Sequence, residues 1–170
     1  MTSQGPERMV GSMNGRKKRS AVQLSQPEAD QLMHEHVGAM SCATVNPDGS
    51  VHLVAMSYAF LDRQLIMTTK AASQKIKNLR RDARMTCLVE EGLNYEELRG
   101  VQLICTTEIV DDPAYVVSAG TEIMHRNLNI DYADIDRDLV QRAMNKRVAV
   151  RITPVRYVTW DHRKLFTRAS

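Results

Sequence analysis

Short apolar and β-branched runs, separated by tight-turn sequences, fill the chain between residues 39 and 110. Runs of this kind suit half-buried strands, and the Asn-Pro-Asp-Gly sequence at 46–49 predicts a hairpin turn between two of them. Tight turns at this spacing favour an antiparallel barrel over strand–helix–strand units. The expected strands here cover residues 39–45, 51–56, 65–69, 84–90 and 101–110, with residues 57–61 either continuing the second strand or forming a new one after a bend.

Other parts of the chain carry apolar residues at helical spacing. Ser25 and Glu28 form a capping-box pattern, which predicts the start of a helix that Gly38 ends. Good helix formers without Gly or Pro predict a second helix over residues 71–81. The pattern between residues 114 and 145 predicts two more helices.

After this helical region, residues 147–153 and 155–160 are expected to form two strands joined through Pro154. The fold class is therefore mainly β with helices (α+β). At 170 residues the chain has the length of one domain, which we place at residues 23–167. Residues 1–22 are polar and lack hydrophobic periodicity, so they are expected to be a flexible basic leader.

Hydrophobic residues make up 43% and charged residues 25% of the chain, as in ordinary soluble domains. No apolar run approaches the roughly 20 residues that a membrane-spanning helix needs. The beginning of the chain also lacks the apolar core of a signal peptide. These observations predict a cytoplasmic protein without a membrane partner.

The net charge of +3 is concentrated at one end of the chain. Residues 1–20 carry five basic side chains and one acidic side chain, so the remainder is close to neutral. A nearly neutral domain gives no support to nucleic-acid binding, which is therefore not expected.

No metal site is predicted. Cys42, Cys87 and Cys105 lack metal-ligand spacing and each lies in an apolar run, so they are expected to be reduced thiols of the core. His34 and His36 are two residues apart on a predicted helix and therefore face different directions.

The segment from residue 65 to residue 81 joins an apolar strand to a basic helix. Thr69, Ser73 and Lys75 are expected to meet at the strand end and the first helical turn. Hydroxyl groups, free backbone N–H groups and an ammonium group would there converge on a phosphate. The alternative is a surface helix with an ordinary solvated basic face.

The sequence lacks the motifs of the common catalytic sites. It contains no CxxC, HExxH or GxGxxG motif, and its acidic pairs fall in turns and loops. A bound redox cofactor would carry the chemistry of a reaction while the protein supplies orientation and shielding.

The basic segment resembles the phosphate-binding segment of the flavin/deazaflavin split-barrel superfamily, which includes pyridoxamine 5′-phosphate oxidase and relatives that use coenzyme F420. The matching residues are Thr68, Thr69, Ser73, Lys75, Asn78, Leu79, Arg80, Arg81, Asp82 and Arg84. The similarity continues through residues 95–101, ends near residues 160–165, and covers roughly residues 25–165. It implies an FMN-binding split β-barrel in which Thr68, Thr69, Ser73 and Lys75 bind the cofactor's phosphate.

The resemblance also implies the surroundings of the cofactor ring. A strand with Val54, Ala55, Met56 and Ser57 would run beside the ring and contact it largely through backbone atoms. His52 would lie near the open face of the ring as the candidate catalytic residue, or it is simply a half-buried histidine of the strand.

In this superfamily the active site lies between two subunits of a homodimer. Arg156 and Trp160 of the C-terminal strand would therefore reach the partner's cofactor, with Arg163 as a second candidate for the polar edge of the ring. Trp160 is alternatively an aromatic residue of the dimer core.

The implied function is an oxidoreductase that transfers a hydride between the cofactor ring and a small conjugated organic substrate. Coenzyme F420 is slightly favoured over FMN, because the surplus of basic residues suits its acidic tail. A carrier or storage protein for flavin, F420 or haem is the first alternative. Pyridoxamine phosphate oxidation is the second, although residues 160–165 lack the Arg-x-His element of those oxidases.

Overall fold

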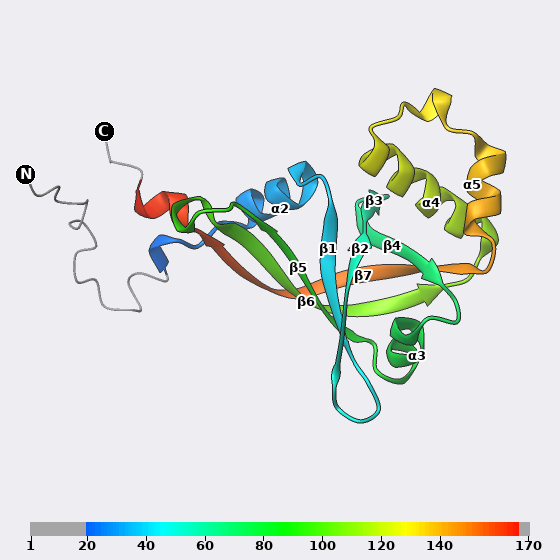
Figure 1. Ribbon diagram of the computed structural model, residues 1–170, viewed down its shortest axis with the longest axis horizontal. Helices are drawn as coiled ribbons and strands as arrows, with labels where there is room; N and C mark the ends of the chain where they lie inside the picture. The colour runs from blue at the N-terminus through cyan, green and yellow to red at the C-terminus, as the bar shows by residue number, and fades with distance from the viewer. Residues whose placement is uncertain (1–19, 167–170) are drawn as a thin grey trace, which may run out of the picture.

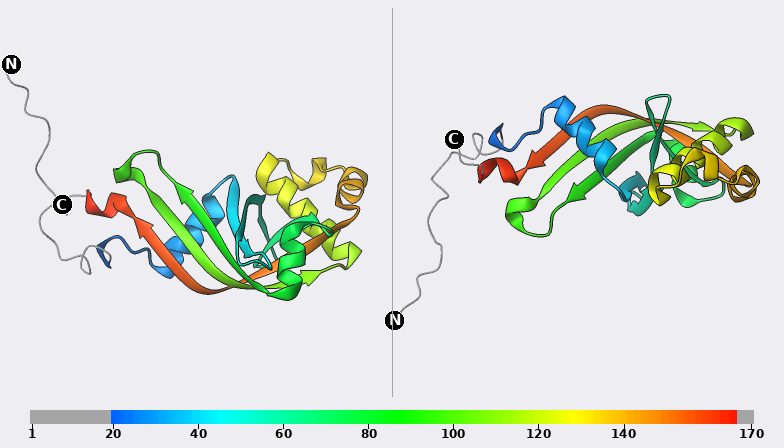
Figure 2. Two further views of the ribbon diagram at one scale, coloured as in Figure 1. Left: turned by 60° about the horizontal axis from the view of Figure 1, so that its bottom comes forward. Right: turned by 90° about the horizontal axis from the view of Figure 1, so that it is seen from above.

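Seven antiparallel strands form one strongly curled sheet in the order β2-β1-β5-β6-β7-β4-β3 (Figures 1 and 2). The computed structural model describes residues 20–166. The strands are β1 (Ala39–Val45), β2 (Val51–Ser57), β3 (Ala59–Leu61), β4 (Gln64–Lys70), β5 (Arg84–Glu91), β6 (Arg99–Val110) and β7 (Arg147–Asp161). The helices are α2 (Gln26–Glu35), α3 (Gln74–Arg81), α4 (Pro113–Leu128) and α5 (Arg137–Met144), with 3-10 turns at Tyr95–Glu97, Tyr132–Asp134 and His162–Leu165. This architecture confirms the predicted α+β class and the split-barrel fold.

Local sequence signals set several of these boundaries. The side chain of Ser25 accepts a hydrogen bond from the Glu28 amide, and Glu28 accepts one from the Ser25 amide, which confirms the predicted capping box. A break at Tyr58 separates β2 from β3, so the second of the two alternatives for residues 57–61 is correct. The helix expected from residue 71 begins only at Gln74.

The prediction of two strands joined through Pro154 was wrong, because β7 runs without interruption for 15 residues. Proline cannot donate a hydrogen bond to a neighbouring strand and is normally excluded from central strands. Here β4 pairs with β7 only as far as Ile152, and a bulge beside Cys105 adjusts the pairing with β6. Pro154 therefore lies where one edge of β7 no longer has a partner strand.

The main core lies between the sheet and α2, and a smaller core lies under α4. All three cysteines are buried and free, as expected. Hydrogen bonds with the Cys105 and Cys42 thiols, together with burial, raise the pKa of Cys87, so the thiol is protonated at neutral pH.

The two ends of β7 lie far apart in the molecule. One end begins beside α5 and near α3, while the other continues into the C-terminal 3-10 turn (Figure 1). The amide of Asp161 donates a hydrogen bond to the carbonyl of Val22, so the last residue assigned to the leader lies along the C-terminal end of β7. Residues 1–19 of the predicted leader fall outside the described residues. Among residues 20–166, no helix has the length and apolar character needed to cross a membrane.

Candidate functional site

Thr69, Ser73 and Lys75 come together where β4 ends and α3 begins. The Lys75 ammonium donates a hydrogen bond to Thr69 Oγ1 at 3.1 Å, and the Thr69 and Ser73 hydroxyl oxygens are 3.5 Å apart. Thr69 is buried, whereas Ser73 and Lys75 are half-buried. One ammonium and two hydroxyl groups therefore point into the same small region.

The N-terminus of α3 adds backbone donors to this region. Ser73 is its N-cap, but the Ser73 side chain makes no capping hydrogen bond, and the first turn contains no acidic residue. The first N–H groups of a helix have no partner inside the helix, and they carry the positive end of its dipole. An anion held by Lys75 would thus also meet unpaired N–H groups.

Burial lowers the pKa of Lys75, and the positive charge of Arg147 lowers it further. Both effects disfavour a charged ammonium group that has no anionic partner. A bound phosphate would supply that partner and raise the pKa of Lys75 again.

Thr68 was predicted to bind the same phosphate, but it occupies the opposite face of β4 from Thr69 because side chains alternate along a strand. Its neighbour on that face, Ile66, packs in the small core under α4. The structure therefore does not bring the Thr68 side chain to the Lys75 cluster, and only its backbone could face the same ligand.

Asn78 fixes the position of α3, a role that the sequence did not reveal. Its side chain is 1% exposed and donates hydrogen bonds to Thr44 Oγ1 at 3.0 Å and Asn46 Oδ1 at 2.9 Å. Its own oxygen accepts a hydrogen bond from Gln74 in the first turn of the helix. A polar residue on the apolar face of α3, between Ile76 and Leu79, was the available signal.

Replacing Asn78 by Ala is expected to lower the free energy of unfolding by about 2–3 kcal/mol, because buried polar partners would lose their hydrogen bonds. Urea unfolding followed by circular dichroism measures the change. Arg80→Ala, on the exposed side of the same helix, is the matched control and should stay within roughly 0.5 kcal/mol of the wild type. An unchanged unfolding midpoint for Asn78→Ala would contradict this structural role.

His52 lies on β2, directly opposite Thr44 on β1. Residues directly opposite in an antiparallel pair share a face of the sheet. His52 therefore lies on the same side as Thr44, which accepts a hydrogen bond from Asn78. His52 is half-buried and has no hydrogen-bond partner among the described residues. It is therefore available to a ligand that contacts this face of β2.

The residues expected beside the ring divide between the two faces of β2. Val54 and Met56 are half-buried on the His52 face, whereas Ala55 and Ser57 are exposed on the other. Their side chains therefore cannot all meet one ligand. The backbone of β2 can still contact the ring, because β2 is an edge strand with one unpaired side.

Trp160 lies at the opposite end of β7 from the Lys75 cluster. It pairs with Gly100, where an added Cβ would come within 2.4 Å of the Trp160 ring. Trp160 lies 13 positions after Arg147, which is roughly 40 Å of strand at the usual rise. Within one chain, Trp160 and Lys75 therefore do not share a site.

The two arginines expected at the polar edge of the ring are also placed. Arg156 lies exposed on β7, and Arg163 forms an ion pair of 2.6 Å with Asp161.

Residues 26–161 match the family described as pyridoxamine 5′-phosphate oxidase, and the chain belongs to this family. No curated protein matches the sequence. The crystal structure of conserved hypothetical protein Rv2991 from Mycobacterium tuberculosis is 39% identical, with 89% of this chain and 94% of that chain covered and a TM-score of 0.81.

Two more distant structures share the fold. An F420 reductase is 22% identical, with 75% of this chain and 94% of that chain covered and a TM-score of 0.57. The haem storage protein HutZ from Vibrio cholerae is 11% identical, with 81% of this chain and 97% of that chain covered and a TM-score of 0.60. The fold therefore occurs both in a reductase and in a storage protein.

Proposed function

We propose that the chain binds coenzyme F420 or FMN through Thr69, Ser73 and Lys75, and that it transfers a hydride between the cofactor ring and a small conjugated organic substrate. The observation that carries this proposal is the convergence of one ammonium and two hydroxyl groups at the uncapped N-terminus of α3. This group of donors suits a phosphate. Family membership and the similarity to an F420 reductase support the choice of cofactor class.

The cofactor would supply the hydride chemistry, and the protein would orient the reactants. Lys75 and the first turn of α3 would fix the phosphate end of the cofactor. The unpaired edge of β2 would then run beside the ring, with His52 facing the same side as Thr44. A flat acceptor on that side would lie close enough for transfer, which needs about 3–3.5 Å between reacting atoms.

We further propose that the working form is a homodimer in which Trp160 and Arg156 complete the partner's site. The length of β7 that separates Trp160 from Lys75 within one chain supports a second copy. Exposed apolar side chains on β2 and β7 offer a surface for it: Val51 is 64%, Leu53 63%, Val155 67% and Val158 42% exposed. Burial of such side chains is a usual driving force of association.

Binding and turnover test the proposal separately. The wild-type protein, titrated with F420 and with FMN, should change the absorption and fluorescence of at least one of them at micromolar concentration. The reduced form of the bound cofactor is then mixed with quinones, enones and tetrapyrroles, and oxidation of the ring is followed spectroscopically. Absence of binding to both cofactors would contradict the proposal.

The second candidate is a protein that carries or stores flavin, F420 or haem without turnover, and the similarity to the storage protein HutZ favours it. Micromolar binding without oxidation by any acceptor would identify this function. Pyridoxamine phosphate oxidation is not proposed, because residues 160–165 lack the Arg-x-His element expected of those oxidases.

His52→Ala is expected to lower the rate of substrate reduction by no more than about tenfold, because solvent can replace a proton donor at an open site. An indispensable general acid contributes roughly a hundredfold or more. Single-turnover oxidation of the reduced cofactor measures the rate, and His34→Ala, an exposed residue of α2, is the control. A loss greater than a hundredfold would make His52 the required proton donor.

A further inference from the structure

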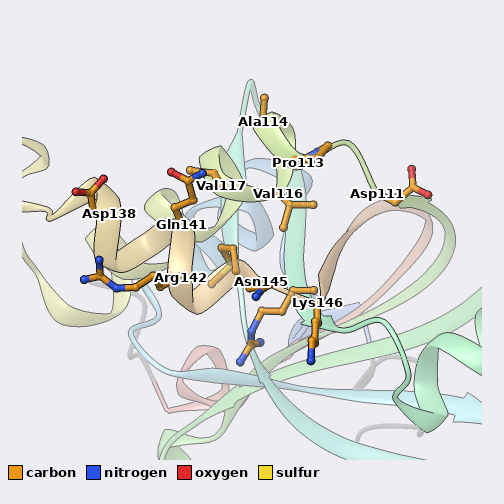
Figure 3. A pocket seen from close by; sticks show the side chains of 12 residues that line it. Asp111, Pro113, Ala114, Val116, Val117, Asp138, Gln141, Arg142, Asn145 and Lys146 are labelled. Atoms are coloured by element: carbon orange, nitrogen blue, oxygen red, sulfur yellow. The ribbon is translucent and has the colours of Figure 1, made fainter.

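The described part of the chain contains a large open groove and a smaller cavity. The groove lies between the start of α4, the helix α5 and the beginning of β7 (Figure 3). Most side chains around the groove are exposed, among them Asp138, Gln141 and Lys146. The smaller cavity has a volume of about 370 Å³ and lies between α2, the turn from β3 to β4, and β7. We name it the α2 cavity.

The α2 cavity lies where β7 parts from β4. The pairing of these two strands ends at Leu65 and Ile152, while β7 continues to Asp161. Gln64 closes the end of β4, because its side-chain amide donates a hydrogen bond of 2.6 Å to the Ile152 carbonyl. The helix α2 adds Met33 to the lining. The cavity therefore forms where the sheet opens and a helix covers the opening.

Strand pairing places the cavity-lining side chains of the sheet on one face. Leu65 is directly opposite both Phe60 and Ile152, and Leu103 is directly opposite Tyr157. Residues directly opposite in an antiparallel pair share a face, and all five belong to the main core or pack against it. Leu65, Leu103 and Ile152 are each 4% exposed or less, so they form an apolar floor. Phe60 and Tyr157 are half-buried and form aromatic walls.

Polar groups lie at the mouth of the cavity. Asp30 and Arg63 carry opposite charges there, and both are exposed. Asp30 accepts a hydrogen bond of 2.9 Å from the Gln26 amide, and a carboxylate can accept several more. Burial raises the pKa of Tyr157, so its hydroxyl group stays protonated and uncharged at neutral pH. A charged ligand would meet a like charge at the mouth and an apolar floor beyond it, whereas a neutral ligand would not lose charge hydration.

We propose that the α2 cavity binds a small, neutral aromatic molecule of one or two rings that carries a hydroxyl group. Its rings would pack on the floor between Phe60 and Tyr157, and its hydroxyl group would donate to Asp30. The volume of about 370 Å³ lies at the lower end of the range of small-molecule sites, roughly 300–1,000 Å³.

This site is separate from the proposed phosphate site. The α2 cavity lies at the Gln64 end of β4, whereas the Lys75 cluster lies at the Lys70 end. Binding to the cavity therefore does not depend on a cofactor held at Lys75.

The test uses 2-naphthol as a neutral probe, with 2-naphthoate and 2-naphthylmethylammonium as charged probes of similar shape. Equilibrium dialysis with the wild-type protein measures the affinities, and methyl NMR locates the probe. We expect saturable binding of 2-naphthol that shifts the methyl signals of Leu65, Leu103 and Ile152. Val116 and Val117 line the α4–α5 groove, and their methyl signals should not move. Both charged probes should bind at least about tenfold more weakly.

Variants of the two aromatic walls test the contacts directly. Tyr157→Ala and Phe60→Leu should each weaken 2-naphthol binding roughly three- to tenfold, because each removes one aromatic pair. Tyr157→Phe keeps the ring and should retain most of the affinity. Tyr95→Ala is the matched control, because Tyr95 is an exposed tyrosine that does not line the cavity. Circular dichroism checks that each variant is folded.

Absence of saturable 2-naphthol binding would overturn the inference, and so would methyl shifts confined to Val116 and Val117. Binding of either charged probe as tight as that of 2-naphthol would overturn the assignment to a neutral ligand. These measurements use no flavin or F420, so any of these results would leave the proposed function standing.

Discussion

Lys75→Ala should bind FMN and F420 roughly ten- to hundredfold more weakly than the wild type, while remaining folded. A hydrogen bond between a charged donor and a phosphate contributes about 1.5–3 kcal/mol, and Lys75 is the charged donor in the proposed phosphate site. The fold should survive because the side chain is half-buried and contacts only Thr69 by a hydrogen bond. Equilibrium titration gives the affinity, and circular dichroism confirms folding.

Two variants on the same segment calibrate this result. Ser73→Ala removes a neutral hydroxyl and should cost about 1 kcal/mol, or roughly fivefold in affinity. Lys77→Ala removes the same charge from an exposed position on α3 and should have little effect. Titration curves of Lys75→Ala that coincide with those of the wild type for both cofactors would refute the phosphate site.

The same lysine predicts how binding depends on pH. Burial and Arg147 lower the pKa of Lys75 in the free protein, so its ammonium group loses its proton at a lower pH than an ordinary lysine. The charged form binds phosphate, and affinity should therefore fall as pH rises through this lowered pKa. Lys75→Ala should lose this dependence on pH.

Features encoded by neighbouring residues could be predicted from the sequence. The capping box at Ser25 and the turn at residues 46–49 depend on contacts within a few positions, and both occur as expected. The meeting of Thr69, Ser73 and Lys75 was equally accessible, because one strand end and one helical turn bring them together.

Features that depend on distant partners could not be predicted in this way. The continuity of β7 through Pro154 depends on where β4 stops pairing, near Ile152. Asn78 holds α3 through Thr44, which is 34 positions away in the chain.

The error at Thr68 has a different cause. Side chains alternate along a strand, so Thr68 and Thr69 must lie on opposite faces of β4. The family resemblance assigned both residues to the phosphate by their spacing alone.

Trp160→Ala is expected to weaken cofactor binding by about 2 kcal/mol or more, roughly thirtyfold, if the indole ring forms a wall of the partner's site. The loss should appear without a change in the Lys75 cluster, which lies at the other end of β7. Gly100 has no side chain and Trp160 packs across it, so the truncated variant leaves a gap and not a clash. Thermal unfolding checks that the variant remains folded.

A mixing experiment then decides whether Trp160 and Lys75 meet across two subunits. In a two-fold symmetric dimer, each site would contain Lys75 of one chain and Trp160 of the other. Lys75→Ala and Trp160→Ala, unfolded together and refolded as an equal mixture, would give mixed dimers in about half of the molecules. Each mixed dimer has one doubly altered site and one site with both native residues, so about one quarter of all sites should regain wild-type affinity. Each variant refolded alone should regain none of these sites.

If both residues acted within their own chain, every site in the mixture would carry one substitution. The titration would then show only the two weakened affinities. A mixture without recovered high-affinity sites, despite proven subunit exchange, would exclude the shared site.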